Sequence, residues 1–149
     1  MKNRKRGFSL VELLIVLAVI AALIATITPV ALNAIQKAKA TKVGQNIKTL
    51  ASAFENYVYV SGEVPANLTD IGRDIDGGAY AVYYAKDEES GTYTVVVKTS
   101  EEANYKTLQG ILADVKEDDY TTTTTSYTGL VDNFTGTVQY HYVFNFTNY

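Results

Sequence analysis

The sequence has no cysteine and only one histidine, His141, among its 149 residues. Without cysteine no disulfide can stabilise the fold, so packing alone must hold it together. The same absence excludes anchoring as a lipoprotein. No nucleophile or carboxylate stands beside His141 in the sequence, and we expect a solvent-facing histidine on a strand rather than a catalytic base. The composition therefore predicts a protein that is not an enzyme and needs no cofactor.

Lysine and arginine are absent from Gly7 to Gln36. Within this segment, the twenty residues from Leu13 to Leu32 carry no charge at all. At about 1.5 Å per residue, such a helix reaches roughly the 30 Å of a bilayer core. The basic leader that precedes it, MKNRKR, favours the cytoplasmic side. The pattern predicts a helix that crosses the membrane outward.

Glu12 interrupts the apolar segment near its start. An ionised carboxylate in such surroundings costs several kcal/mol unless a cation or a donor meets it. The partner must come from the leader, from lipid headgroups or from another molecule. If the chain is cut after Gly7, Phe8 gains a free amine four residues before Glu12 on the same helical face. A charge pair then becomes possible within one subunit, and a better one between staggered neighbours.

The letters KRG, FSLVE and the apolar run that follows resemble the leader and helix of type IV pilins and pseudopilins. The resemblance covers Arg6 to about Pro29. It implies that a prepilin peptidase cuts between Gly7 and Phe8, that the amine of Phe8 is N-methylated, and that Phe8 and Glu12 govern assembly into a helical filament. Pro29 matches a proline near which the family's helix loosens, and we expect a kink there.

Two ordinary alternatives also fit a basic leader before an apolar run: a secretory signal and an uncleaved anchor. A signal-peptidase site needs small residues two apart just beyond the run, but the first Ala-x-Ala pair after the run, Ala38 and Ala40, lies in polar sequence. An uncleaved anchor gives no reason for Glu12 or for Gly7 at the border. We therefore favour the pilin-like interpretation.

The charge balance turns more acidic once the leader is removed. The whole chain has a net charge of -3, and the leader holds four of its thirteen basic residues. Nine Lys and Arg then remain against sixteen Asp and Glu, a balance of -7. This argues against direct nucleic-acid binding. Many pilins close a C-terminal loop with a disulfide, and this cysteine-free chain departs from that pattern.

Beyond Pro29 the helix becomes amphipathic. Apolar residues spaced by three and four form one stripe, which should seat a sheet: Val43, Ile47, Leu50, Phe54 and Tyr57. We expect the helix to run from about Phe8 to Tyr59. The lysines among the stripe residues are interpreted either as contacts with lipid headgroups before assembly and with acidic neighbours afterwards, or as a solvated face. We place Lys37, Lys39 and Lys42 at headgroups and Lys48 in solvent.

Residues 61–78 contain proline and glycines and predict a loop with one short helical turn. Asp70, Asp74 and Asp76 fall within it and raise the possibility of calcium binding. The spacing lacks the alternation and the closing glutamate of an EF-hand, so we favour a solvated turn and no metal.

Two β-rich runs around KDEESG predict a hairpin of residues 79–85 and 92–98. We expect Tyr80, Val82 and Tyr84 on one face and the alternating residues from Tyr93 to Val97 on another, with one face covering the helix stripe.

The rest of the chain predicts one more helix and two strands. Residues 99–119 form a short helix with Thr99 and Glu102 as a capping box, and a packed structural role is favoured for it over partner contacts. Residues 120–128 form an edge-like strand, and residues 137–146 form the last strand.

The sequence thus predicts an α+β, pilin-like fold: a cleaved leader (1–7), a long helix (8–60, of which 8–32 form the membrane and filament core) and a β-rich head (61–149) with about four antiparallel strands. The favoured function is that of a structural subunit, of the major kind, of a type IV pilus serving adhesion, motility or DNA uptake. Its expected partners are copies of itself, the prepilin peptidase, the assembly platform with its ATPase, and the inner membrane before the subunit reaches the cell surface. The alternatives are a pseudopilin of a type II secretion or competence system and a membrane-anchored binding domain that never polymerises.

Overall fold

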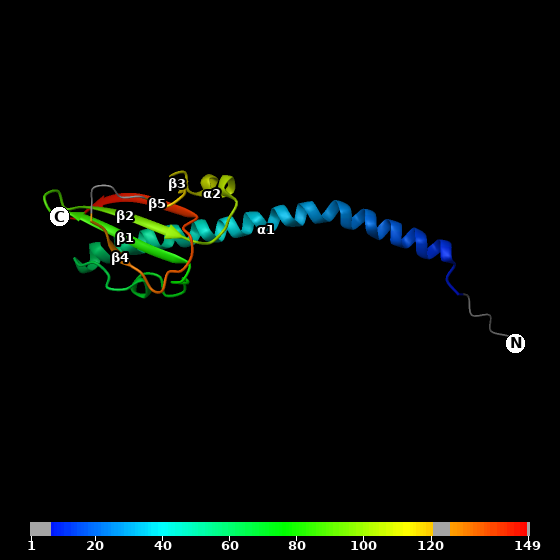
Figure 1. Ribbon diagram of the computed structural model, residues 1–149, viewed down its shortest axis with the longest axis horizontal. Coiled ribbons are helices and arrows are strands. Elements are labelled where there is room, and N and C mark those ends of the chain that lie inside the picture. The colour runs from blue at the N-terminus through cyan, green and yellow to red at the C-terminus, as the bar shows by residue number, and fades with distance from the viewer. Residues whose placement is uncertain (1–6, 121–125, 149) are drawn as a thin grey trace. The chain divides into compact units, whose positions relative to one another are not determined.

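The computed structural model of the protein describes residues 7–120 and 126–148 (Figure 1). A long helix, a 3₁₀ turn, a short helix and five strands make up this part of the chain. In order they are α1 (Leu10–Ser61), η1 (Leu68–Asp70), β1 (Tyr80–Asp87), β2 (Thr92–Thr99), α2 (Tyr105–Ile111), β3 (Val115–Glu117), β4 (Thr128–Leu130) and β5 (Tyr140–Thr147). The chain divides into two units after Gln36. The fold is α+β, with a long apolar N-terminal helix and an antiparallel sheet packed on it, as the sequence predicts.

Helix α1 is continuous over 52 residues. From Ala40 onward one stripe of the helix is buried, with the spacing of three and four expected for a single face. Four of the five predicted stripe residues are fully buried, and Tyr57 is half-buried against the core. Gly44 lies in the stripe where α2 crosses, because a β-carbon there would lie 3.1 Å from Ile111 and 3.2 Å from Leu108. The distal part of α1 therefore forms one wall of the head's core.

The sheet has five antiparallel strands in the order β3-β5-β2-β1-β4. The predicted hairpin is confirmed as β1 and β2, in which Val82 lies opposite Val97 and Tyr84 opposite Val95. Cross-strand partners share a face of the sheet. The prediction that these two sets occupy different faces is therefore wrong, and both sets cover α1 together.

Phe54 of α1 lies at the centre of the core between the helix and the sheet. Its side chain is fully buried, and its ring centroid lies 5.4 Å from that of Tyr84 and 6.2 Å from that of Phe146. We expect Phe54→Ala to lower the free energy of unfolding by about 3–5 kcal/mol, because the cavity adds to the lost transfer term. Urea unfolding of the full chain in detergent measures this. The exposed Ser52→Ala is the control, and a Phe54→Ala loss below about 1 kcal/mol would contradict the packing.

The second helix is shorter than the sequence predicts. Thr99 does not cap it, because Thr99 ends β2 opposite Tyr80 and its hydroxyl donates to the carbonyl of Ala79 at 3.0 Å. The N-cap is Asn104, whose side chain accepts from the backbone N–H of Thr107. After Ile111 the chain returns to the sheet as β3, which pairs with β5. This short strand is one reason why the sheet has five strands rather than about four.

The C-terminal part is only partly described. The predicted strand over residues 120–128 falls mostly on residues 121–125, which lie outside the described residues, and its last residue, Thr128, opens the short edge strand β4. The predicted last strand is β5, which begins at Tyr140 and lies between β2 and β3. Its alternating aromatic residues face the core.

His141 is buried, so the expectation that it faces solvent is wrong. Only 6 % of the residue is exposed. Its Nδ1 lies 2.7 Å from the carbonyl oxygen of Asp118, and its ring centroid lies 5.4 Å from that of Tyr120. The sheet face that points away from α1 is covered here by the chain that follows β3. His141 contributes to packing at that position.

Candidate functional site

The segment from Gly7 to Gln36 contains the residues that the sequence singles out. Its large apolar side chains are exposed along the whole segment, and the most apolar stretch has no residue buried within the protein. By length and composition this part of α1 can cross a membrane. An apolar helix without an internal partner needs lipid or other helices around it.

Glu12 lies in the first turn of α1 and is held there by a capping box with Ser9. The backbone N–H of Ser9 donates to Oε2 of Glu12 at 2.8 Å, and Oγ of Ser9 accepts from the N–H of Val11 at 3.3 Å. Both contacts satisfy donors that a helix start leaves unpaired. The expectation that Glu12 must find its partner outside the segment is therefore incomplete, because a backbone donor already meets the carboxylate.

This donor is neutral, however, and within residues 7–120 and 126–148 no cation pairs with Glu12. Helix α1 contributes a favourable but partial positive charge at its N-terminus. No lysine or arginine lies between Gly7 and Gln36 to complete the pair. The role of Ser9 is not among the expectations drawn from the sequence, although the spacing Ser-x-x-Glu before an apolar run is typical of a capping box.

Gly7 and Phe8 precede the helix and are open to an approaching enzyme. A β-carbon built on Gly7 would meet no atom within 4 Å, and Phe8 is 83 % exposed. Nothing in the fold therefore requires glycine at this position. A requirement for Gly7 must come from a molecule that recognises it.

Pro29 lies inside α1 without ending it. It has no N–H to donate to the carbonyl of Ala25, four residues before it. In the turns just before it, the hydroxyl of Thr28 donates to the carbonyl of Ile24 at 2.7 Å, and that of Thr26 to Leu23 at 2.9 Å. Such back-bonding also tends to bend helices. The loosening of the helix near Pro29 remains a prediction.

Two aspartates of the predicted loop accept hydrogen bonds from its backbone. Asp70 accepts hydrogen bonds from the N–H groups of Ala66 and Asn67, and Asp76 from that of Gly78. These contacts stabilise turns, including the single 3₁₀ turn η1 that the sequence predicts. Within the described ranges, no group of three potential ligands is placed to hold a metal.

A half-buried polar network joins α1 to the sheet at the buried Tyr80. The Tyr80 hydroxyl donates to Glu101 at 2.9 Å and accepts from the amide of Asn46 at 3.2 Å. Burial raises the pKa of Tyr80 well above its ordinary value, with a further increase from Glu101. The network therefore requires a protonated Tyr80.

We expect the head to lose stability as the pH rises above about 10, the ordinary pKa of tyrosine. The raised pKa means that the folded state binds the Tyr80 proton more tightly than the unfolded state does. The contribution of the Tyr80 proton to the free energy of unfolding is therefore complete below pH 10 and is lost as the pH rises above it. Tyr80→Phe should flatten this decline in urea unfolding measured from pH 8 to pH 11. An unchanged slope would contradict the assignment.

These observations define a class: a pilin-like protein with a long exposed apolar helix and an antiparallel sheet on the helix's distal part. More particularly, residues 2–28 match the family model described as the prokaryotic N-terminal methylation motif. This motif is typical of type IV pilins and pseudopilins, which are not usually enzymes, and it implies processing by a prepilin peptidase. The motif and the helix together indicate a place first in the membrane and then in a pilus. Comparisons with curated proteins and with solved structures found no match.

Proposed function

We propose that the protein is a structural subunit of a type IV pilus, and its major one. The observation that carries the proposal is the exposed apolar part of α1, with one carboxylate at its start and a methylation motif over residues 2–28. A membrane anchor needs the apolar length alone. A polymerising helix also needs a group that selects one arrangement among neighbours, and Glu12 is such a group.

The physical reason begins with the environment of the helix. Lipid tails are as apolar as leucine. Moving the helix from lipid into a bundle of like helices therefore changes the free energy of its apolar side chains little. Extraction from the membrane therefore requires the assembly platform and its ATPase. Glu12 differs from these side chains, because its charge is costly in lipid and is stabilised when a cation pairs with it.

The proposed cation is the amine of Phe8 on a neighbouring subunit. Cleavage between Gly7 and Phe8 creates this amine, and N-methylation leaves it protonated. Arrangements that leave Glu12 unpaired are then rejected, so the pair sets the register of the filament. A head-to-tail contact that does not close produces a fibre.

The subunit is proposed to reside first in the inner membrane and then in the filament on the cell surface, with the acidic head outermost. The proposed filament serves adhesion, motility or DNA uptake.

Shearing cells and analysing the filaments tests the proposal. We expect this chain to be the abundant subunit of the sheared material, and we expect the filaments to be lost when its gene is deleted. A processed chain that stays in the envelope under conditions in which other pili are recovered would overturn the pilus assignment and favour a pseudopilin.

A further inference from the structure

The distal part of α1, from Lys37, belongs to the same unit as the sheet, and from here on we call that whole unit the head. Its charges are separated between α1 and the chain after Ser61. From Lys37 to Ser61 the helix carries four lysines and one acidic residue, Glu55. The chain after Ser61 has fourteen acidic residues against five basic ones. The lysines of the helix are exposed, and within residues 7–120 and 126–148 none of them forms an ion pair.

Three of these lysines gather at the end of the head where α1 first meets the sheet. We call Lys37, Lys39 and Lys42 the basic collar. Lys39 and Lys42 line a surface hollow of about 300 Å³ together with Glu101 and Glu102. The Glu101 carboxylate is already engaged by the hydroxyl of Tyr80. The collar therefore presents ammonium groups beside an open space large enough for side chains of another molecule.

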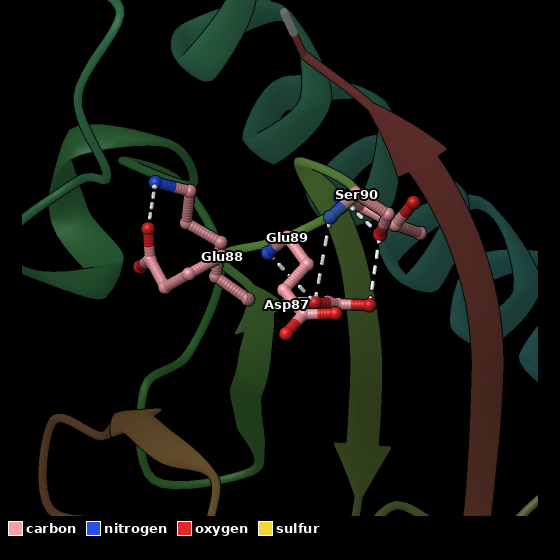
Figure 2. Close-up of polar contacts among 6 residues, drawn as sticks. Asp87, Glu88, Glu89 and Ser90 are labelled. Atoms are coloured by element: carbon pink, nitrogen blue, oxygen red, sulfur yellow. Dashed lines mark hydrogen bonds and ion pairs between the residues drawn. The ribbon is translucent and has the colours of Figure 1, made fainter.

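The turn between β1 and β2 presents the opposite charge. We call Asp87, Glu88 and Glu89 the acidic turn. Figure 2 shows how it is held: the carboxylate of Asp87 accepts from the N–H of Glu89 at 3.0 Å and from the hydroxyl of Ser90 at 2.9 Å. The bond from Ser90, with smaller help from the backbone, lowers the pKa of Asp87 and keeps it ionised. The turn is thus fixed by its own hydrogen bonds.

Two carboxylates remain at the surface of this turn. The side chain of Glu88 is 78 % exposed and pairs with Lys86 at 2.9 Å. The exposed carboxylate of Glu89 has no ion-pair partner in the part of the chain that the structure describes. The acidic turn therefore has unused negative charge on a rigid support.

The acidic turn and the basic collar lie at opposite ends of the head. Gly91, which closes the turn, accepts from the N–H of Asn148, and the amide of Asn148 donates to the carbonyl of Val58. The turn is thus tied to the last turns of α1. Lys42 lies sixteen residues earlier in the helix, or about 24 Å along it. Each head consequently carries a negative end and a positive end.

We propose that the acidic turn of one copy docks against the basic collar of a second copy, end to end. The inference rests on the proposed polymerisation and names the head surfaces that meet. The two surfaces differ, so the contact is heterologous and repeats without closing. Exposed ion pairs are individually weak and are screened by salt, so the contact fixes the register of the heads rather than driving assembly.

Cross-linking between introduced cysteines tests the contact directly, because the chain has no cysteine of its own. Lys42→Cys and Glu89→Cys are placed in one chain, and sheared filaments are treated with a short bismaleimide. We expect a ladder of dimers, trimers and longer products, since each subunit then links to two others. Each single variant should give at most dimers. Filaments of the double variant that yield monomers only would overturn the proposal.

Charge reversal provides a second, independent measurement. Lys39→Glu with Lys42→Glu should lower the filament yield about tenfold, as should Glu88→Lys with Glu89→Lys, because like charges then face each other. All four changes together should restore the yield to within about twofold of wild type. Asp114→Lys with Glu117→Lys, which alters the same number of exposed acidic residues elsewhere on the head, is the matched control and should leave the yield unchanged.

The outcomes separate this inference from the proposed function. If the wild-type chain forms no filaments, the function fails first. If wild-type filaments form and all reversed variants assemble normally, the function stands and the docking is wrong. If the lysine variant lowers the filament yield and the combined variant with all four changes does not restore it, the lysines act elsewhere, for example at anionic headgroups, and the docking is again wrong.

Discussion

Replacing Glu12 with glutamine is expected to reduce filament yield by about 100-fold or more, while the helix start stays folded. Glutamine can still accept the N–H of Ser9 in the capping box, so only the charge is lost. A hydrogen bond to a charged group contributes about 1.5–3 kcal/mol, and each subunit would share one such pair through Glu12 and another through Phe8. Electron microscopy and the mass of sheared protein per cell measure the loss.

Ser9→Ala and Asp74→Ala are the controls for this prediction. Ser9→Ala removes the cap in which the serine hydroxyl oxygen accepts from the N–H of Val11, worth about 1 kcal/mol, and keeps the charge of Glu12, so assembly should persist. Asp74 is an exposed carboxylate of the head, so Asp74→Ala should leave the filament yield unchanged. If Glu12→Gln assembles as wild type and Ser9→Ala does not, the role of Glu12 is to cap α1, and the pairing with Phe8 is wrong.

Replacing Gly7 with valine is expected to abolish processing and, with it, filaments. The fold tolerates the change, because a β-carbon at Gly7 meets no atom within 4 Å. The loss must then arise in recognition by the prepilin peptidase. The subunit should accumulate in the membrane fraction with its basic leader attached, and its Glu12 should have no neighbouring amine of Phe8 to pair with.

Mass spectrometry of the membrane fraction measures the retained leader, and circular dichroism in detergent checks that α1 and the sheet are intact. The unfolding midpoint of the Gly7→Val variant should equal that of wild type. Normal filaments built from subunits that keep the leader would contradict the proposed cleavage site.

The sequence predicts the structure best where the pattern of apolar residues along one segment determines that segment's conformation. The uncharged run from Leu13 to Leu32 predicts an apolar helix, and the spacing from Val43 to Phe54 predicts its buried stripe, because both follow from helical periodicity. The hairpin likewise follows from two β-rich runs around a polar turn. These features are local, and the structure confirms them.

The expectations are wrong where contacts between segments far apart in the sequence determine a residue's pairing or burial. Thr99 has the spacing of a cap, but pairing with Tyr80 in the sheet outweighs it. His141 alternates with aromatic residues and was therefore expected in solvent, yet a segment more than twenty residues earlier covers it through Asp118 and Tyr120. No local pattern encodes such coverage. The contacts between Ser9 and Glu12 are also local, and the spacing Ser-x-x-Glu before an apolar run is enough to predict them.

The central claim is that the apolar helix, once trimmed, polymerises through a charge at its start. Mass spectrometry of the N-terminal peptide from sheared filaments tests it most directly. The account predicts a subunit that begins at Phe8 and carries a methyl group on its amine. A filament subunit that begins at Met1, or a chain that is found only as single copies in the membrane, would contradict it.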